Sequence, residues 1–197
     1  MLNTLHKQRG VTMIELMIGL TIAGILLTIG APSFSDWIQN TRIHNSAESI
    51  TSGLQLARAE AVRLNAQVQF QLNGTDGSWT AGCVNSSANC PAVIQSRSST
   101  EGSTAGISAS TSEVDAVTNA PAGTALFTGT LIFNGLGRAT TAKLTAGNNA
   151  LIDITNPDID DCMPDGTMRC LRIVVSSGGQ IRMCNPAFAQ ATNPQGC

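Results

Sequence analysis

The sequence predicts an α+β protein in which one long, bent N-terminal helix packs on antiparallel β-sheets. Three features of the 197-residue chain support this fold class. An apolar run at residues 11–31 is followed by a segment, residues 32–66, in which apolar side chains recur at helical spacing. Beyond this segment the period changes to two, as in half-buried strands. We therefore expect an apolar helix, an amphipathic helix that continues it, and a β-rich globular domain over residues 67–197.

The apolar run begins directly after a short basic leader, residues 1–10. At a rise of about 1.5 Å per residue, a helix over residues 11–31 is long enough to cross a hydrocarbon core of about 30 Å. Lys7 and Arg9 lie only on its N-terminal side. The positive-inside bias then predicts a single-pass inner-membrane protein with its C-terminal domain in the periplasm.

Glu15 is the one acidic residue inside the apolar run. A carboxylate in this setting costs on the order of 2.5 kcal/mol or more, so we interpret it as a functional group with a partner. A natural partner is the α-amino group that a cut after Gly10 would release. Ordinary secretory signals are cut after the apolar region, so this arrangement differs from them.

Gly10 and the residues that follow it, 11–16 (VTMIEL), resemble the class III signal of type IV pilins and type II secretion pseudopilins. The resemblance implies that prepilin peptidase cuts between Gly10 and Val11 and that Val11 is N-methylated. It also implies that Glu15 forms an assembly salt bridge. A plain signal anchor with a chance glutamate remains the alternative.

The second part of the predicted helix begins at Pro32, which lacks an amide donor and should kink a continuous helix. Its apolar residues recur every three or four positions, and we expect this stripe to pack on the chain's own domain. Charged residues, including Glu60 and Arg63 one turn apart, occupy the opposite face. The stripe consists of Ile43, Ala47, Ile50, Leu54, Ala57, Ala61 and Leu64.

Alternating polar and apolar residues predict a strand at 67–72, with turn residues Asn73 and Gly74 leading into a second strand at 79–84. Residues 96–123 are rich in Ser, Thr, Ala and Gly and predict a long surface excursion with at most one weak strand. Further strands are expected at 92–95, 125–127, 131–133, 151–154 and 171–175, the last one central and continuing through a hairpin to residue 184.

Six cysteines follow the apolar run, and an even number in an exported chain predicts disulfides. Six cysteines allow 15 pairings. We favour bonds between sequence neighbours, because each such pair brackets a segment with Pro or Gly that can turn back. The favoured pairs are Cys83 with Cys90, Cys162 with Cys170, and Cys184 with Cys197.

The sequence predicts neither an enzyme nor a cofactor or metal site. His44 is the only histidine beyond the leader, so a serine or cysteine triad lacks its usual base. There is no Cys-x-x-Cys pair for zinc. The acidic segment 156–168 predicts a solvated loop, with a calcium site as the alternative.

Several later segments resemble the GspH/FimT family: Trp79 with Gly82, residues 131–138, residues 170–175 and residues 178–184. The resemblance implies a type IV pilin-like fold and a minor pilin that joins an assembly-priming or tip complex of a type IV pilus. The implied partners are other major and minor pilins, prepilin peptidase, the inner-membrane assembly platform and, before assembly, membrane lipid. A GspH-like pseudopilin of type II secretion is the alternative.

A second alternative is a FimT-like pilin that binds DNA in natural transformation. FimT proteins resemble this chain in a C-terminal Gly-Arg-x-Arg motif, in which Gln180 here replaces the first arginine. A weakly basic strip would supply the phosphate contacts, and binding would then fall steeply with salt. The residues of this possible DNA site are Lys143, Arg169, Arg172 and Arg182.

Overall fold

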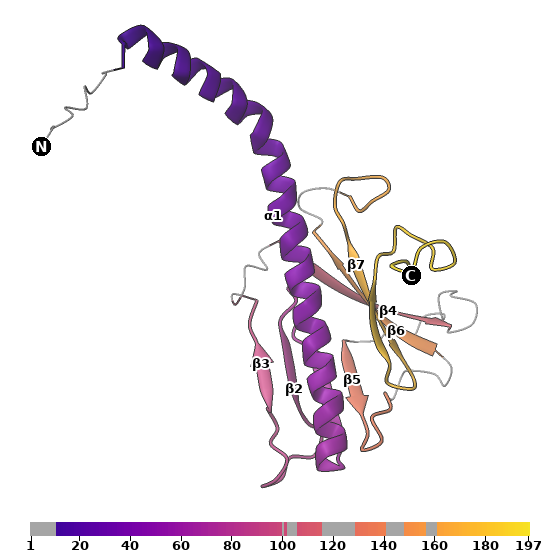
Figure 1. Cartoon of the computed structure of the whole chain (residues 1–197). Helices are drawn as coiled ribbons and strands as arrows, with labels where there is room; N and C mark the ends of the chain where they lie inside the picture. The colour runs from indigo at the N-terminus through magenta and orange to yellow at the C-terminus, as the bar shows by residue number, and fades with distance from the viewer. Residues whose placement is uncertain (1–10, 100, 102–105, 116–128, 141–147, 157–160) are drawn as a thin grey trace, which may run out of the picture. The chain divides into compact units, whose positions relative to one another are not determined.

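The computed structural model describes residues 11–99, 101, 106–115, 129–140, 148–156 and 161–197, apart from the side chains of residues 29–33 and 115. Its longest element is helix α1, Met13–Leu64 (Figure 1). The chain divides into two compact units, Met1–Ile38 and Gln39–Cys197, and each is described by itself. The structure does not describe the side chain of Pro32, so the kink stays a prediction.

The described residues of the second unit form two four-stranded sheets whose paired strands are all antiparallel. The first sheet has the order β3-β2-β1-β5 and the second has the order β4-β6-β7-β8. Strand β7 is internal, as the sequence predicts. The bounds are β1 Val68–Leu72, β2 Trp79–Cys83, β3 Gln95–Arg97, β4 Ser108–Asp115, β5 Thr130–Phe133, β6 Asn148–Thr155, β7 Leu171–Ser176 and β8 Ile181–Cys184.

Strand β4 corrects the expectation of a long surface excursion. It pairs with β6 at eight positions, from Ser108 opposite Thr155 to Asp115 opposite Asn148. Its sequence, SASTSEVD, has no apolar alternation, so the hydropathy pattern gave no strong signal. The hydrogen bonds to β6 hold it in place, together with burial of the small side chain of Ala109.

Strand β3 begins three residues later than the first residue predicted for it. The segment before it approaches β2 closely: a Cβ on Gly82 would lie 1.8 Å from the carbonyl oxygen of Ala92. Gly82 is therefore required at this crossing. The strand predicted at 125–127 lies outside the described residues.

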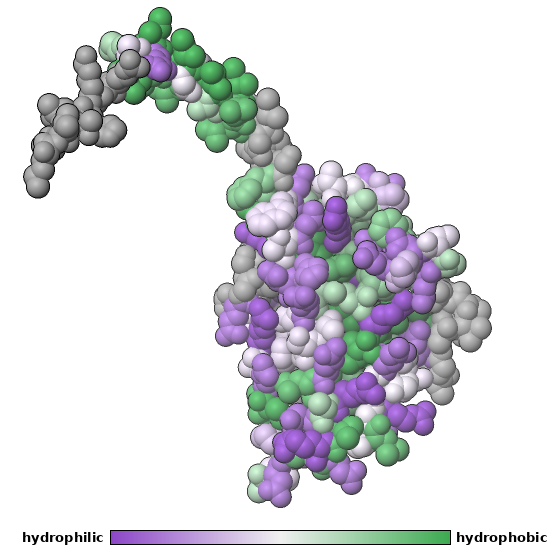
Figure 2. Space-filling model, in the orientation of Figure 1, coloured by the Kyte–Doolittle hydropathy of each residue, from purple (hydrophilic) through white to green (hydrophobic). Residues whose placement is uncertain are grey.

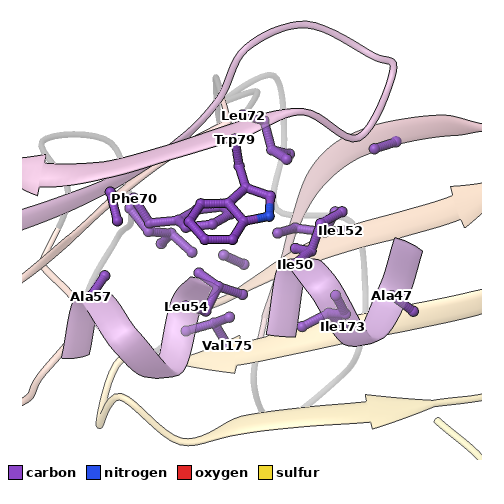
Figure 3. Packing of buried hydrophobic residues seen from close by; sticks show 14 of the residues in the cluster. Ala47, Ile50, Leu54, Ala57, Phe70, Leu72, Trp79, Ile152, Ile173 and Val175 are labelled. Carbon is purple, nitrogen blue, oxygen red and sulfur yellow. The ribbon is translucent and has the colours of Figure 1, made fainter. Parts of the chain in front are cut away.

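The apolar stripe of α1 is confirmed as the part of the helix that enters the core. Its residues from Ile43 to Ala61 are fully buried, and Leu64 is partly buried. Figure 3 shows side chains of α1, of β1 and β2, and of β6 and β7 meeting in one apolar cluster. A Cβ on Gly53 would lie within 3 Å of both Phe70 and Trp79, so the missing side chain lets the aromatic rings approach the helix.

Polar contacts fix the helix against the sheets at two positions along its length. The indole Nε1–H of Trp79 donates a 2.9 Å hydrogen bond to Oγ of Ser49, which satisfies two buried polar groups. Near the end of α1, Nε of Arg58 donates to the carbonyl oxygen of Gly137 at 3.1 Å. On the solvent side, Glu60 and Arg63 form the expected ion pair, at 2.7 Å.

The turn between β1 and β2 is built around Asp76. Its carboxylate accepts hydrogen bonds from the hydroxyl of Ser78 at 2.6 Å and from the Ser78 amide at 3.0 Å. These bonds favour the charged form and lower the pKa of Asp76 below its ordinary value. Gly77, the residue between them, has a φ of 76°, which favours glycine.

Three disulfides join the pairs of sequence neighbours favoured above: Cys83–Cys90, Cys162–Cys170 and Cys184–Cys197. The third one ties the C-terminal tail back to the end of β8, where Asn185 also bridges to Gly196. This disulfide closes the loop that follows β8, the last strand. It can therefore be removed without breaking the hydrogen bonds between strands.

Candidate functional site: the apolar half of the helix

The N-terminal half of α1 exposes apolar side chains along its length, and Figure 2 shows them on the face in view. Consecutive residues such as Leu16, Met17 and Ile18 are each more than half exposed, so no face of this segment is covered by the chain itself. The other large exposed side chains here are Val11, Met13, Ile14, Leu20, Ile22, Ile25, Leu26 and Leu27. A helix that is apolar all round requires an apolar environment.

The hydroxyls of two threonines within this half are satisfied by the helix itself. The hydroxyl of Thr21 donates to the carbonyl oxygen of Ile18, and that of Thr28 donates to the carbonyl oxygen of Ile25, each at 2.8 Å. Such back-bonding removes the need for water. The two threonines are therefore compatible with lipid or with other helices around them.

The helix begins with a capping arrangement that involves Glu15. The backbone N–H of Glu15 donates to Oγ1 of Thr12 at 3.3 Å, and the N–H of Leu16 donates to the Thr12 carbonyl at 3.1 Å. Thr12 is thus the N-cap and Glu15 occupies the third helical position, which is the spacing of a capping box. The carboxylate also lies in the first turn, where the helix dipole favours negative charge.

The N-cap role of Thr12 was not among the predictions made from the sequence. The signal that would have found it is the Thr-x-x-Glu spacing immediately before an apolar run. Gly10, the predicted cleavage residue, lies outside the described residues, whereas Val11 is described and exposed. Within the described part of the chain, no helix is long and apolar enough to cross a membrane.

The residues of the possible DNA site are only partly brought together. Arg172 and Arg182 line one pocket of about 410 Å³ on the second sheet, beside Phe188 of the C-terminal tail. Arg169 does not line this pocket, and its backbone N–H donates to Oδ1 of Asn40. Lys143 lies outside the described residues.

Both arginines of the pocket already have partners. Arg172 forms a two-point ion pair with Asp153, with Nε–Oδ1 at 2.6 Å and Nη2–Oδ2 at 3.1 Å. Arg182 donates from Nη1 to the carbonyl oxygen of Gly196 at 3.3 Å. Because Asp153 offsets the charge of Arg172, the pocket is less basic than the sequence suggests. DNA binding stays a prediction.

The described residues contain no group of three or more His, Cys, Asp or Glu side chains that could hold a metal ion. Asp158 and Asp160 of the acidic segment fall outside the description. The solvated loop and the calcium alternative both stay predictions.

An apolar helix with a capped N-terminus, continued into a β-rich domain, is typical of pilins and pseudopilins. Two family models match the chain in agreement with this class: a prokaryotic N-terminal methylation motif over residues 5–31, and the type II transport protein GspH over residues 46–179. The second match covers more than half of the chain. The chain belongs to the GspH family and is a minor pilin or pseudopilin.

Solved structures of this class are similar to the chain at low sequence identity. The type IV minor pilin FimU of Pseudomonas aeruginosa is 16% identical, with 82% of this chain and 98% of that chain covered and a TM-score of 0.48. The minor pseudopilin EpsH of the Vibrio cholerae type 2 secretion system is 14% identical, with 75% and 99% covered and a TM-score of 0.47. A search of the curated proteins found no match.

Proposed function

We propose that this chain is a minor pilin that is held in the inner membrane, cut by prepilin peptidase after Gly10, and built into a type IV pilus as part of an assembly-priming or tip complex. The observation that carries the proposal is the exposed, all-round apolar surface of residues 11–28, which starts directly after Gly10. Its role is structural, since the surface is suited to packing among other helices.

The apolar half supplies the driving force for insertion into the membrane and keeps an apolar environment in the filament. Moving one Leu or Ile side chain from water to an apolar environment contributes about 1.5–3 kcal/mol. The described residues alone present eleven large apolar side chains from Val11 to Leu27. Lipid satisfies this surface before assembly, and the helices of neighbouring major and minor pilins satisfy it in the filament.

Glu15 gives the assembled helices their register. After cleavage, the methylated amine of Val11 carries a positive charge four residues before Glu15. In the filament, Glu15 of this chain neutralises the N-terminal amine of a neighbouring subunit as that subunit leaves the bilayer. A charge pair of this kind in a low-dielectric bundle fixes alignment more than it adds stability.

The test is recovery of the chain in sheared pili from cells that carry Glu15→Gln. Glutamine keeps the hydrogen-bonding groups of the capping box but removes the charge. We expect incorporation to fall to background while the amount of folded chain in the membrane is unchanged. Glu48→Gln is the matched control, because Glu48 is an exposed glutamate of the same helix within the domain. Normal incorporation of Glu15→Gln would refute the role.

A pseudopilin of type II secretion is the second candidate, and the match to the type II transport protein GspH supports it. The same helix and the same glutamate would then act in a pseudopilus. Deletion of the gene distinguishes the two: a pilin leaves cells without normal pili but with normal secretion, whereas a pseudopilin leaves exoproteins in the periplasm. Both candidates predict the same loss for Glu15→Gln.

A further inference from the structure

We propose that Phe34 and Trp37 form an aromatic anchor that sits in the headgroup layer on the periplasmic side of the inner membrane before the chain joins a filament. This inference rests on the membrane-held state of the proposed function. It adds a defined contact with phospholipid headgroups, made by two side chains that the pilin motif does not include.

The two rings form one exposed platform. Phe34 and Trp37 are three residues apart on α1 and therefore lie on the same side of the helix. Their ring centroids are 5.9 Å apart and the rings are stacked, with an interplanar angle of 27°. Phe34 is 61% exposed and Trp37 is 63% exposed, so the platform faces outward.

Exposure of a tryptophan here contrasts with the rest of the molecule. The chain has two tryptophans and no tyrosine. Trp79 is almost fully buried, and its indole N–H is bonded to Ser49. Trp37 leaves most of a large amphipathic ring at the surface. Amphipathic rings of this type are enriched at membrane–water interfaces.

The position along the helix matches the far interface of a bilayer. With Val11 at the cytoplasmic edge, Phe34 lies about 35 Å further along the helix axis. The hydrocarbon core is about 30 Å thick and the whole bilayer about 40–45 Å, so Phe34 and Trp37 reach the opposite headgroup layer. A helix tilt of about 20° moves them a few ångström closer to the core.

The neighbouring residue Asp36 limits how deep the platform can go. It is partly exposed and adjacent to Trp37 in the sequence. A carboxylate is costly in hydrocarbon and is accommodated among headgroups. Before cleavage, Lys7 and Arg9 mark the other end of the segment. In the mature chain the charged amine of Val11 takes their place, so a positive charge before the apolar run and aromatic residues after it together set the depth of the helix.

The experiment uses the mature chain from Val11, with its disulfides intact, in phosphatidylcholine vesicles. Separate vesicle samples carry bromine near the headgroup end, in the middle, or near the terminal methyl of the acyl chains, and Trp fluorescence is recorded in each. We expect the strongest quenching from the shallowest bromine and the weakest from the deepest. Trp37→Phe should abolish the lipid-dependent quenching, because Trp79 is inside the folded domain and serves as an internal control.

Flotation of the same vesicles distinguishes a failure of the aromatic anchor from a failure of the membrane-held state. Chain that floats with the vesicles but shows no quenching, or shows its strongest quenching from the deepest bromine, overturns the anchor and leaves the membrane-held state intact. Chain that does not float overturns both. Lipid-dependent quenching that persists in Trp37→Phe also overturns the anchor, since it would then come from Trp79.

Discussion

The N-terminal half of α1 exposes apolar side chains on every side, whereas the C-terminal half buries one apolar stripe and leaves most of the rest of its surface polar. Leu16 and Leu54 illustrate the difference, since the first is 56% exposed and the second is fully buried. The C-terminal half therefore buries its apolar side chains in the core of the chain's own domain. The N-terminal half requires an apolar environment from lipid or from other subunits. In the proposed function it therefore serves assembly rather than folding of the domain.

The largest effect on stability is expected where the helix enters the core. Leu54→Ala should lower the free energy of unfolding of the domain by about 2–5 kcal/mol, because it leaves a cavity between the helix and the sheets. Leu16→Ala is the matched control and should change it by less than about 0.5 kcal/mol. Urea unfolding of the full mature chain in detergent micelles measures both. Equal losses in the two variants would contradict the division between the halves.

An intermediate effect is expected at the C-terminal disulfide. Replacing Cys184 and Cys197 together by serine opens a loop with a sequence separation of 13. Chain-entropy arguments predict a loss of about 3 kcal/mol in the stability of the domain, since the unfolded chain gains freedom. The thermal unfolding midpoint measures this loss, and incorporation into pili should be retained. A variant that is stable but absent from sheared pili would instead place an assembly contact on the C-terminal tail.

The smallest effect is expected at Asp76, which lies in a surface turn of the domain. Hydrogen bonds from Ser78 lower the pKa of its carboxyl below the ordinary value of 3.8. A lowered pKa in the folded state stabilises the protein above the unfolded pKa, and this contribution is lost as the pH falls through the folded pKa. Asp76→Asn should therefore lower the unfolding midpoint slightly at neutral pH. The difference from wild type should shrink at pH values below the folded pKa.

A matched control for this pH effect is Asp36→Asn, since Asp36 is a partly exposed carboxylate outside the turn. A difference between Asp76→Asn and wild type that is the same at neutral and at strongly acidic pH would contradict the assigned cause. It would show that the side-chain shape, and not the charge, stabilises the turn.

Local patterns predicted much of this fold. The stripe from Ile43 to Ala61, the alternation around Phe70 and the hairpin that ends at Cys184 are all encoded within a few residues, and the structure confirms them. The favoured cysteine pairs also close short loops. Such features follow from the helical period of 3.6 and the strand period of two.

Features that depend on distant partners could not be predicted. Strand β4 is rich in serine and threonine, and its sequence has no apolar alternation that would predict its pairing with β6. The ion pair between Arg172 and Asp153 exists because the register of β6 against β7 places these residues opposite each other. Sequence alone also gave no reason to place β5 beside β1. Each of these depends on long-range register rather than on composition.

The division of α1 into an assembly half and a folding half is tested most directly with residues 39–197 alone, oxidised and in buffer without detergent. Trp79 is then the only tryptophan, so its fluorescence during urea unfolding reports the core. We predict one cooperative transition with a free energy of unfolding of about 5–15 kcal/mol, as for ordinary domains. A fragment that shows no transition, with Trp79 exposed in buffer, would mean that the domain needs the N-terminal half to fold and would contradict the account.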